Sequence, residues 1–454
     1  MNSNPIRHQP IVLAPREVHP TIGKYMLADG EHLVIDLQGS HGPYLRDAAT
    51  GREYLDFYAH FASQPVGHNH PKLRDPAFLQ RINDVALYKP ANSDVYTTYM
   101  AEFVETFARI AKPADMAHLF FIDGGGLAVE NALKTAFDWK IRKNLAAGKG
   151  ERGAKVIHFQ EAFHGRTGYT LSLTNTADPR KHMYFPKFDW PRIVNPKLHF
   201  PVTAEALAQT AATEAQAVAE IEAAVRANPD DIAALIIEPI QGEGGDNHFR
   251  PEFFAELRRL ADAHDFMFIV DEVQTGLGAT GTMWAIEQMG VRPDSIAFGK
   301  KTQVCGIIVG PRVDEAPDNV FHVSSRLNST WGGNLVDMVR SQRYLEIIEE
   351  ENLVANAATT GKALLDGLNQ LAAGSDLIDN VRGRGMLLAF DLPDTRARDL
   401  FRGLLMANGV LALKSGSRSI RFRPMLDLDN PAVEAGLAAI EKSLYDARRN
   451  GGQL

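Results

Sequence analysis

Two continuous apolar runs, each ending near an ionisable side chain, constrain the fold of this 454-residue chain more than any other feature. The run FMFIVD ends at Asp271, and the run SIAFGK ends at Lys300. An uninterrupted apolar run bounded by charge and glycine is typical of a parallel strand that is covered on both faces. In open α/β sheets the carboxyl ends of such strands face the ligand crevice. The sequence therefore predicts an α/β sheet in which an acid and an amine converge on one pocket.

The remaining chain agrees with a doubly wound sheet. Helical and apolar strand patterns alternate from about residue 95 to 310, as expected when helices cover both faces of a parallel sheet. Helices are predicted over 203–227 and 251–266. An extended arm of about forty residues precedes GPYLRDAATGREYLDFYA, which predicts an antiparallel hairpin turning at Thr50 and Gly51. Arg382–Leu392 fits one strand of a smaller unit, with its arginines at a surface or interface.

Lys300 is a candidate nucleophile. Desolvation and cationic neighbours lower the pKa of a buried amine and free its lone pair to attack an aldehyde. A carboxylate at Asp271 can keep the nitrogen of a pyridine ring protonated, as in pyridoxal phosphate enzymes. Lys301 competes with Lys300, but adjacent residues of a strand or extended turn point to opposite sides, so only one can face the ring. The alternative is that Asp271 caps a strand end and Lys300 is solvated.

Two further runs offer groups that suit such a cofactor. Gly124–Gly126 stand between a strand pattern and a helix pattern. Glycines let backbone N–H groups approach a phosphate, and a helix N-terminus adds its dipole, although a plain turn would also explain them. The run EAFHGR supplies Phe163 and His164 as flat groups that can stack on a ring, and Arg166 as a fork for a carboxylate. Taken alone, Phe163 would be assigned to the core.

With these motifs together, the chain resembles the class III, fold-type I, pyridoxal-phosphate-dependent aminotransferases. The resemblance covers nearly the whole chain and rests on four runs in the family's order and spacing: IIEPIQGEGGDNHFRPEFF, FIVDEVQTGLGATGTMWA, FGKKTQVCG and STWGGN. Within that class, FGKKTQVCG and the glycine triplet are most similar to the lysine 6-aminotransferases. The resemblance implies a large doubly wound, mostly parallel-sheet domain over residues 91–345. It also implies a smaller α+β domain built from both chain ends, with the arm and part of this domain in 1–90 and the rest in 346–454.

The resemblance also implies pyridoxal 5′-phosphate as cofactor, no metal, and a role for each matching residue. Lys300 would form the imine with the cofactor, and Asp271 would pair with the ring nitrogen. Gln274 would meet the ring hydroxyl. Glu238, which ends the run ALIIE, is expected near that hydroxyl or the acid cluster, although capping of the strand end explains it equally well. Four further residues would enclose the cofactor, namely Val273 and Phe163 on the two faces of the ring and Gly125 and Gly126 as N–H donors to the phosphate.

The phosphate site departs from the family's usual pattern. The family usually has Ser-Gly-Thr or Ser-Gly-Ser where this chain has Gly124–Gly126. Side-chain hydroxyl contacts are therefore lost, and phosphate binding would depend on backbone donors and on Thr330. By resemblance, Thr330 reaches the phosphate of the neighbouring subunit, so that the site belongs to a homodimer.

Two arginines and a glutamate would select the substrates. A donor that reacts at a terminal amine and the acceptor 2-oxoglutarate place their carboxylates at different distances from the ring. Arg166 resembles the fork for the far carboxylate, and Arg421 resembles the fork for a carboxylate beside the reacting carbon. Glu243 resembles a gate that neutralises Arg421 while lysine is bound, since a buried unpaired guanidinium is costly. The alternative is that Glu243 is a solvated acid in a loop. Asn328 would touch the α-amino end of the donor.

The implied reaction moves the terminal (6-) amino group of L-lysine to 2-oxoglutarate. Its products are L-glutamate and 2-aminoadipate 6-semialdehyde, which cyclises to piperideine-6-carboxylate. Ornithine and 4-aminobutyrate are alternative donors, because each also presents a terminal amine and a distant carboxylate. A pyridoxal-phosphate-dependent aminomutase and a noncatalytic binding protein are alternatives of other classes. A transcription regulator is disfavoured, because no helix-turn-helix extension precedes the hairpin.

Composition limits the partners and the location. The net charge is 48 − 56 = −8 without a basic block, which argues against nucleic acid. No run approaches the roughly eighteen apolar residues of a membrane span, and MNSNPIRHQPIVLAPREVHP lacks a signal-peptide core. A cytoplasmic protein with no membrane contact is therefore expected. The single cysteine, Cys305, permits no internal disulfide and is expected to be an apolar filler beside the Lys300 strand.

Overall fold

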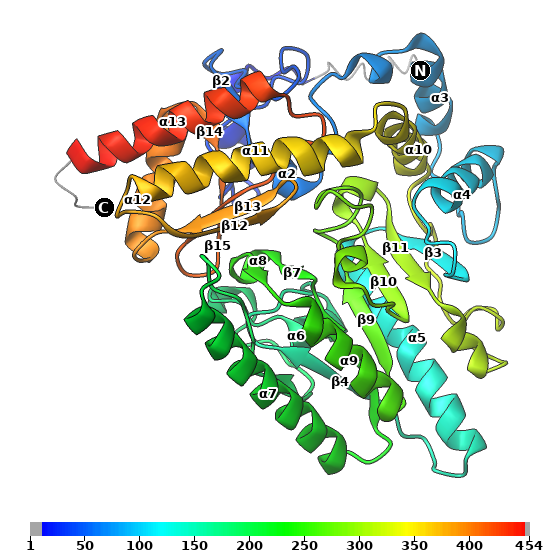
Figure 1. Ribbon diagram of the computed structural model, residues 1–454. Helices are drawn as coiled ribbons and strands as arrows, with labels where there is room; N and C mark the ends of the chain where they lie inside the picture. Colours follow the sequence, from blue (N-terminus) through cyan, green and yellow to red (C-terminus); the bar gives the residue numbers. More distant parts are fainter. Residues whose placement is uncertain (1–10, 450–454) are drawn as a thin grey trace, which may run out of the picture.

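A seven-stranded sheet forms the centre of the computed structural model, which describes residues 11–449 (Figure 1). The strand order is β3-β11-β10-β9-β6-β4-β5. Strand β11 is antiparallel to β3 and β10, whereas the other neighbours pair in parallel. The strands are β3 His118–Ile122, β4 Lys155–Phe159, β5 Arg192–Ile193, β6 Ile232–Ile237, β9 Met267–Asp271, β10 Ser295–Phe298 and β11 Cys305–Val309. The predicted mostly parallel sheet of a fold-type I architecture is confirmed.

Helices cover both faces of this sheet. In β9, Met267 and Ile269 face the core formed with α5 (Gly125–Ala146), and Phe268 and Val270 face the core formed with α9 (Pro251–Ala263). This alternation places apolar side chains on both sides of one strand, which explains its unbroken apolar run. The other helices of this part are α4 Thr98–Ile110, α6 Gly168–Leu173, α7 Ala204–Ala227 and α10 Leu335–Glu350. The helix predicted over 203–227 is thereby confirmed, and the helix predicted over 251–266 is confirmed as far as Ala263, where α9 ends.

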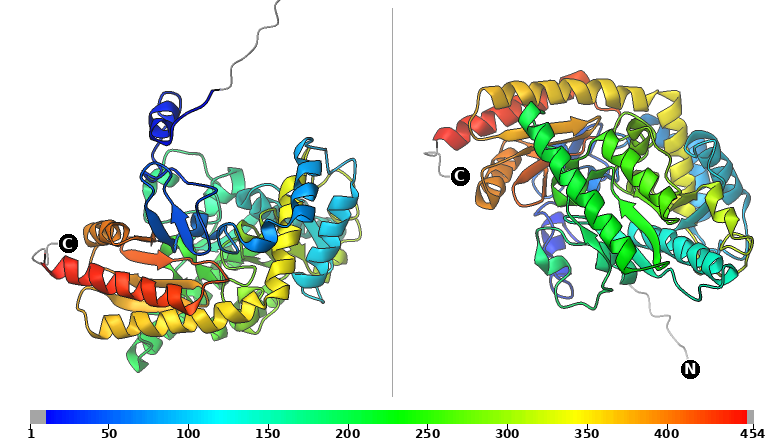
Figure 2. Two further views of the ribbon diagram at one scale, coloured as in Figure 1. Left: turned by 90° about the horizontal axis from the view of Figure 1, so that it is seen from above. Right: turned by 60° about the horizontal axis from the view of Figure 1, so that its bottom comes forward.

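Two of the smaller sheets have three or more strands and lie beside the large one. A four-stranded antiparallel sheet has the order β12-β13-β16-β15, with strands β12 Asp379–Arg384, β13 Leu387–Asp391, β15 Leu413–Ser415 and β16 Ser419–Phe422. Its helices are α11 Leu353–Ala373, α12 Thr395–Ala407 and α13 Asn430–Arg449. A three-stranded sheet joins segments from both chain ends, because β14 (Val410–Leu411) pairs in parallel with β2 (Glu53–Asp56). The N-terminal strands accordingly lie beside the C-terminal segments (Figure 2).

The hairpin predicted near the start is confirmed. Strand β1 (Tyr44–Arg46) pairs antiparallel with β2, and the turn contains Thr50 and Gly51. The domain bounds at 90/91 and 345/346 remain predictions. The short elements are η1 Pro15–Glu17, α1 Val18–Ile22, α2 Ala59–Ala62, η2 Pro71–Leu73, α3 Pro76–Ala86, η3 Pro179–Lys181, β7 Ile240–Gln241, α8 Gly242–Gly245, β8 Asn247–His248, η4 Ala285–Met289, η5 Lys300–Thr302 and η6 Pro311–Glu315.

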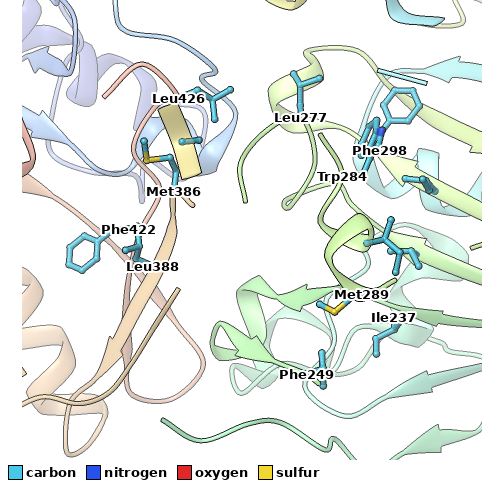
Figure 3. Close-up of a cluster of buried hydrophobic side chains, with 14 of the residues drawn as sticks. Ile237, Phe249, Leu277, Trp284, Met289, Phe298, Met386, Leu388, Phe422 and Leu426 are labelled. Atoms are coloured by element: carbon cyan, nitrogen blue, oxygen red, sulfur yellow. The ribbon is translucent and has the colours of Figure 1, made fainter. Parts of the chain in front are cut away.

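One apolar core connects the large sheet with the four-stranded sheet. Figure 3 shows Trp284 and Phe298 on the side of the large sheet, and Leu388 and Phe422 on the strands of the smaller one. All four side chains are buried and belong to the same cluster. The smaller sheet is therefore packed onto the large one through an apolar core. Among residues 11–449, no helix combines the length and apolarity that a bilayer span requires.

Two local predictions are wrong. The N-terminal arm is not wholly extended, since η1 and α1 lie within it; its first ten residues are outside the described part. The run Arg382–Leu392 forms the hairpin of β12 and β13 instead of one strand, because Gly385 turns the chain at a φ of +55°. Arg382 is buried and not at the surface, and of the two predicted locations an interface agrees with the bond that its Nε donates to the carbonyl of Asp246 at 2.9 Å. Its Nη2 donates to Asp391 at 2.8 Å.

Candidate active site

The carboxyl ends of three neighbouring parallel strands carry ionisable side chains. Glu238 follows β6, Asp271 ends β9, and Lys300 follows β10 after one glycine. Strand β9 pairs in parallel with both β6 and β10, so the three side chains share one edge of the sheet. This is the edge at which open α/β sheets bind ligands.

The sequence had suggested that Lys300 ends a strand. In the structure Lys300 lies in a strained turn that follows the strand. It has a φ of +53°, in the left-handed region that costs a residue with a side chain about 1–2 kcal/mol. Burial, and then the nearby Arg421, lower the pKa of Lys300 to about 8. Lys301 turns elsewhere, since its Nζ donates to the carbonyl of Ala62 at 2.8 Å. The two lysines therefore have different surroundings, as predicted. The reason is the helical turn η5 that contains both, and not the alternation of side chains along a strand.

Asp271 is held by two donors. His164 Nδ1 donates to Oδ2 at 2.8 Å, and the backbone N–H of Val273 donates to Oδ1 at 3.0 Å. Both Asp271 and His164 are buried. His164 is therefore placed next to the acid, whereas the sequence had suggested that it stacks on a ring.

Glu238 is fully enclosed beside this pair. Its oxygens accept from the backbone N–H groups of Phe163 at 2.9 Å and Gly242 at 3.1 Å. Burial, with a further contribution from Asp271, raises the pKa of Glu238 to about 7. Glu238 also fixes the backbone that carries Phe163, which the sequence had not indicated.

The start of α5 forms an open cradle of backbone donors. Gly124 is the residue before the helix and has a φ of +96°, and no side chain caps the first turn. A Cβ on Gly125 would lie 2.8 Å from the side chain of Val273, and a Cβ on Gly126 would lie 3.3 Å from Thr167. Side chains at these positions would crowd the approach that an anion needs.

A buried guanidinium faces a glutamate across the site. Arg421 Nη2 donates to Glu243 Oε2 at 2.5 Å, and Nη1 donates to Gln274 Oε1 at 3.2 Å. The Nε atom of Arg421 is buried without a partner in the described chain. Burial raises the pKa of Glu243, but Arg421 and Lys181 outweigh it and hold that pKa below its ordinary value. Glu243 and Arg421 are therefore paired, as the closed position of the predicted gate requires, and the gating role itself remains a prediction.

The side-chain oxygen of Gln274 accepts hydrogen bonds from two arginines. The Nε of Arg423 donates to Gln274 Oε1 at 3.0 Å, in addition to the bond from Arg421. Arg423 also forms a fully buried ion pair with Asp246. Of Gln274, the amide NH2 is the part that could meet a ring hydroxyl. Arg423 and Asp246 were not identified from the sequence, because neither stands in a motif that indicates a buried pair.

Three predicted substrate or phosphate residues are exposed, unlike the buried residues of this cluster. Arg166 is exposed, forms no ion pair within residues 11–449, and has its guanidinium 6.0 Å from the centre of the Phe163 ring. Asn328 and Thr330 are exposed, and Asn328 lines a surface pocket with Ser93. The carbonyl of Thr330 accepts from Ser93 at 3.2 Å. Their predicted contacts with substrate and with a neighbouring phosphate remain predictions.

The residues present fit a pyridine-ring phosphate. The first turn of α5 has no side-chain cap, so its backbone N–H groups can serve as donors to the phosphate, and Asp271 is an acid fixed by His164 at the sheet edge. The orphaned Nε of Arg421 can donate to a substrate carboxylate. An amine of lowered pKa, Lys300, stands at the same edge.

The sheet and this cluster at its carboxyl edge define a fold-type I transferase. The model of the aminotransferase class-III family matches residues 25–444, and the chain belongs to this family. It is 52% identical over 433 residues to the L-lysine-epsilon aminotransferase of Mycobacterium bovis, covering 95% of this chain and 96% of that protein. The corresponding enzyme of Streptomyces clavuligerus is 47% identical, with 95% of each chain covered.

Solved structures agree. The lysine aminotransferase from M. tuberculosis in the internal aldimine form has a TM-score of 0.93 and 51% identity, covering 96% of this chain and 100% of that chain. Among the relatives found by sequence, the human mitochondrial 4-aminobutyrate aminotransferase is more distant, with 33% identity over 88% of this chain and 82% of that protein. The recognition of a class III aminotransferase from the sequence is confirmed.

Proposed function

We propose that the protein transfers the terminal amino group of L-lysine to 2-oxoglutarate with pyridoxal 5′-phosphate as cofactor. Two of the relatives described above, at 47% and 52% identity, are L-lysine-epsilon aminotransferases. The observation that carries the proposal is the pairing of Glu243 with buried Arg421 while Arg166 has no acidic partner in the described chain. This arrangement suits a donor with one distant carboxylate and an acceptor with two.

The cofactor would be held by the residues at the sheet edge. The backbone N–H groups of Gly125 and Gly126 would bind its phosphate, and Val273 and Phe163 would enclose its ring. Asp271 would keep the ring nitrogen protonated, and Gln274 and Glu238 would lie on the side of the ring hydroxyl. When bound, the cofactor supplies an aldehyde that carries the amino group and a ring that withdraws electrons.

The protein's own groups would position both substrates. Arg166 would bind the far carboxylate, that of lysine or the side-chain carboxylate of 2-oxoglutarate, and Asn328 would contact the α-amino end of lysine. Glu243 would neutralise Arg421 during the lysine half-reaction, and would leave it when the second carboxylate of 2-oxoglutarate arrives. Lys300 Nζ would take the proton from carbon 6 of lysine as general base and would deliver it, as general acid, to the cofactor carbon that bore the aldehyde.

We also propose a homodimer in which Thr330 contacts the phosphate of the partner subunit. In its support, Thr330 is exposed and borders Trp331, which is 47% exposed. Tyr88 and Tyr96 are 77% and 73% exposed. Large aromatic side chains that remain exposed on a single chain are typical of an interface core.

A donor panel tests the reaction. The purified protein is given 2-oxoglutarate with lysine, ornithine or 4-aminobutyrate, and the cyclic imine product is trapped with o-aminobenzaldehyde. Lysine should give the six-membered imine together with stoichiometric glutamate. Activity confined to 4-aminobutyrate or ornithine would overturn the donor assignment, and turnover without glutamate would indicate an aminomutase.

A further inference from the structure

Glu243 lies between two cations and not one. Its Oε2 accepts from Arg421, and its Oε1 forms an ion pair with the Nζ of Lys181. The Glu243 side chain is 21% exposed and that of Lys181 is 19% exposed, so both are largely shielded from water. Both carboxylate oxygens are therefore occupied in the closed arrangement.

Lys181 reaches the site from an independent segment. It ends η3, a short turn between α6 and β5 that Asp178 begins by accepting the N–H of Arg180 at 3.1 Å. Its Nζ lies 5.9 Å from the centre of the Phe163 ring. Within residues 11–449, Glu243 is the acid with which Lys181 pairs. Lys181 therefore forms no ion pair with any other acid of the described chain.

The gate raises a problem of charge that Lys181 can solve. When the second carboxylate of 2-oxoglutarate binds Arg421, Glu243 must leave the guanidinium. A carboxylate shielded from water and left without a cation is strongly disfavoured. A second cation that keeps its bond to Glu243 in both positions removes most of this cost.

We infer that Lys181 is a positioning residue that retains Glu243 when the acceptor carboxylate takes Arg421. This inference rests on the proposed function, since it concerns the gate of that same site. Lys181 thereby lowers the free energy of opening and favours the dicarboxylate substrate. Binding of the substrate lysine requires the closed gate, so this lower free energy of opening does not strengthen it. Loss of Lys181 and loss of Glu243 should consequently act on opposite half-reactions.

The holoenzyme with Lys181→Met tests the inference. Glutarate, a dicarboxylate that cannot react, is titrated by calorimetry, and both half-reactions are followed in single turnovers. We expect glutarate to bind about ten-fold more weakly, which corresponds to one strong charged contact. The apparent KM for 2-oxoglutarate should rise by a similar factor, while the lysine half-reaction changes by less than about two-fold.

Matched variants separate positioning from general damage. Lys181→Arg keeps a cation and should restore glutarate binding. Lys187 is an exposed cation of the same segment, and within residues 11–449 its Nζ donates to the carbonyl of His182 alone. Lys187→Met should therefore leave the affinity for glutarate unchanged. In a Glu243→Ala background, Lys181→Met should have no further effect on glutarate. Lys181→Gln serves if the methionine variant does not fold.

Specific outcomes overturn the inference. Unchanged glutarate affinity in Lys181→Met, equal losses in both half-reactions, or a loss that persists without Glu243 would each show that Lys181 does not act through the gate. Failure of the proposed donor is recognised separately, because glutarate binding involves no amine donor. If the native protein does not react with lysine while Lys181→Met still binds glutarate more weakly, the inference stands and lysine is rejected as the substrate.

Discussion

His164 Nδ1 donates to the carboxylate of Asp271 at 2.8 Å, and both side chains are buried. Because a buried carboxylate needs donors, removal of the imidazole should cost about 1–3 kcal/mol of stability. We expect His164→Ala to lower the free energy of unfolding by this amount and to weaken cofactor retention about ten-fold. Denaturant unfolding and cofactor titration measure the two effects. His164→Asn, which keeps an N–H donor, should recover part of each, and unchanged cofactor affinity in His164→Ala would contradict the role given to this pair.

Lys300 and Lys301 should differ sharply in covalent chemistry. We expect Lys300→Ala to retain no cofactor after borohydride reduction and gel filtration, because it lacks the reacting amine. Lys301→Met should keep the covalent label at position 300, since Lys301 Nζ is turned to the carbonyl of Ala62. Peptide mapping by mass spectrometry locates the label. A reduced adduct at position 301 of the native protein would reverse the assignment.

The lowered pKa of Lys300 predicts how the cofactor-free protein takes up pyridoxal phosphate. The amine is neutral and reactive above its pKa of about 8, whereas an ordinary lysine would need a pH above about 10. The second-order rate of reconstitution should therefore rise with pH and level off somewhat above pH 8. Stopped-flow absorbance at several pH values measures it. A rate still rising steeply at pH 10 would mean that burial and Arg421 do not lower the pKa of Lys300.

Removal of the gate carboxylate should affect the two half-reactions unequally. In Glu243→Ala, the buried Arg421 loses its ion pair whenever lysine occupies the site. We expect the rate of the lysine half-reaction to fall at least ten-fold, while the 2-oxoglutarate half-reaction changes little. Single-turnover absorbance of each half-reaction provides the comparison. Equal losses in both would refute the gate.

Glu272 should make stability fall as pH rises. Burial raises the pKa of Glu272 to about 7, although Thr275 and the N–H of Ile286 donate to its oxygens. A raised folded-state pKa stabilises the protein fully below the unfolded value, and this contribution is lost as pH rises through about 7, up to about 3 kcal/mol. Glu272→Gln should therefore flatten the decline of unfolding free energy between about pH 5 and 8.

Urea unfolding across that pH range tests the role of Glu272. Glu252→Gln, at the exposed start of α9, is the matched control and should leave the native slope unchanged. If Glu272→Gln and the native protein show the same pH dependence of the unfolding free energy, the folded state does not raise the pKa of the Glu272 carboxyl.

Much of the fold could be predicted from local patterns. The unbroken apolar runs before Asp271 and Lys300 correspond to strands β9 and β10, because a strand covered on both faces needs apolar side chains at every position. The same reasoning fails at Arg382–Leu392, where a left-handed glycine divides one apparent strand into two. A Cβ on Gly385 would lie 2.5 Å from the backbone of Thr280, a long-range contact that no local pattern records.

The sequence by itself predicted that an amine and an acid after two buried strands meet at one edge of a parallel sheet, and the resemblance of four motifs to the class III aminotransferases implied the class of chemistry. Only the tertiary structure decided which groups surround them. His164 is 107 residues from Asp271, and Lys181 is 62 residues from Glu243. Contacts at such separations depend on how the elements pack, and periodicity encodes only the face that each element buries. The residues that tune the site therefore became visible only with the folded chain.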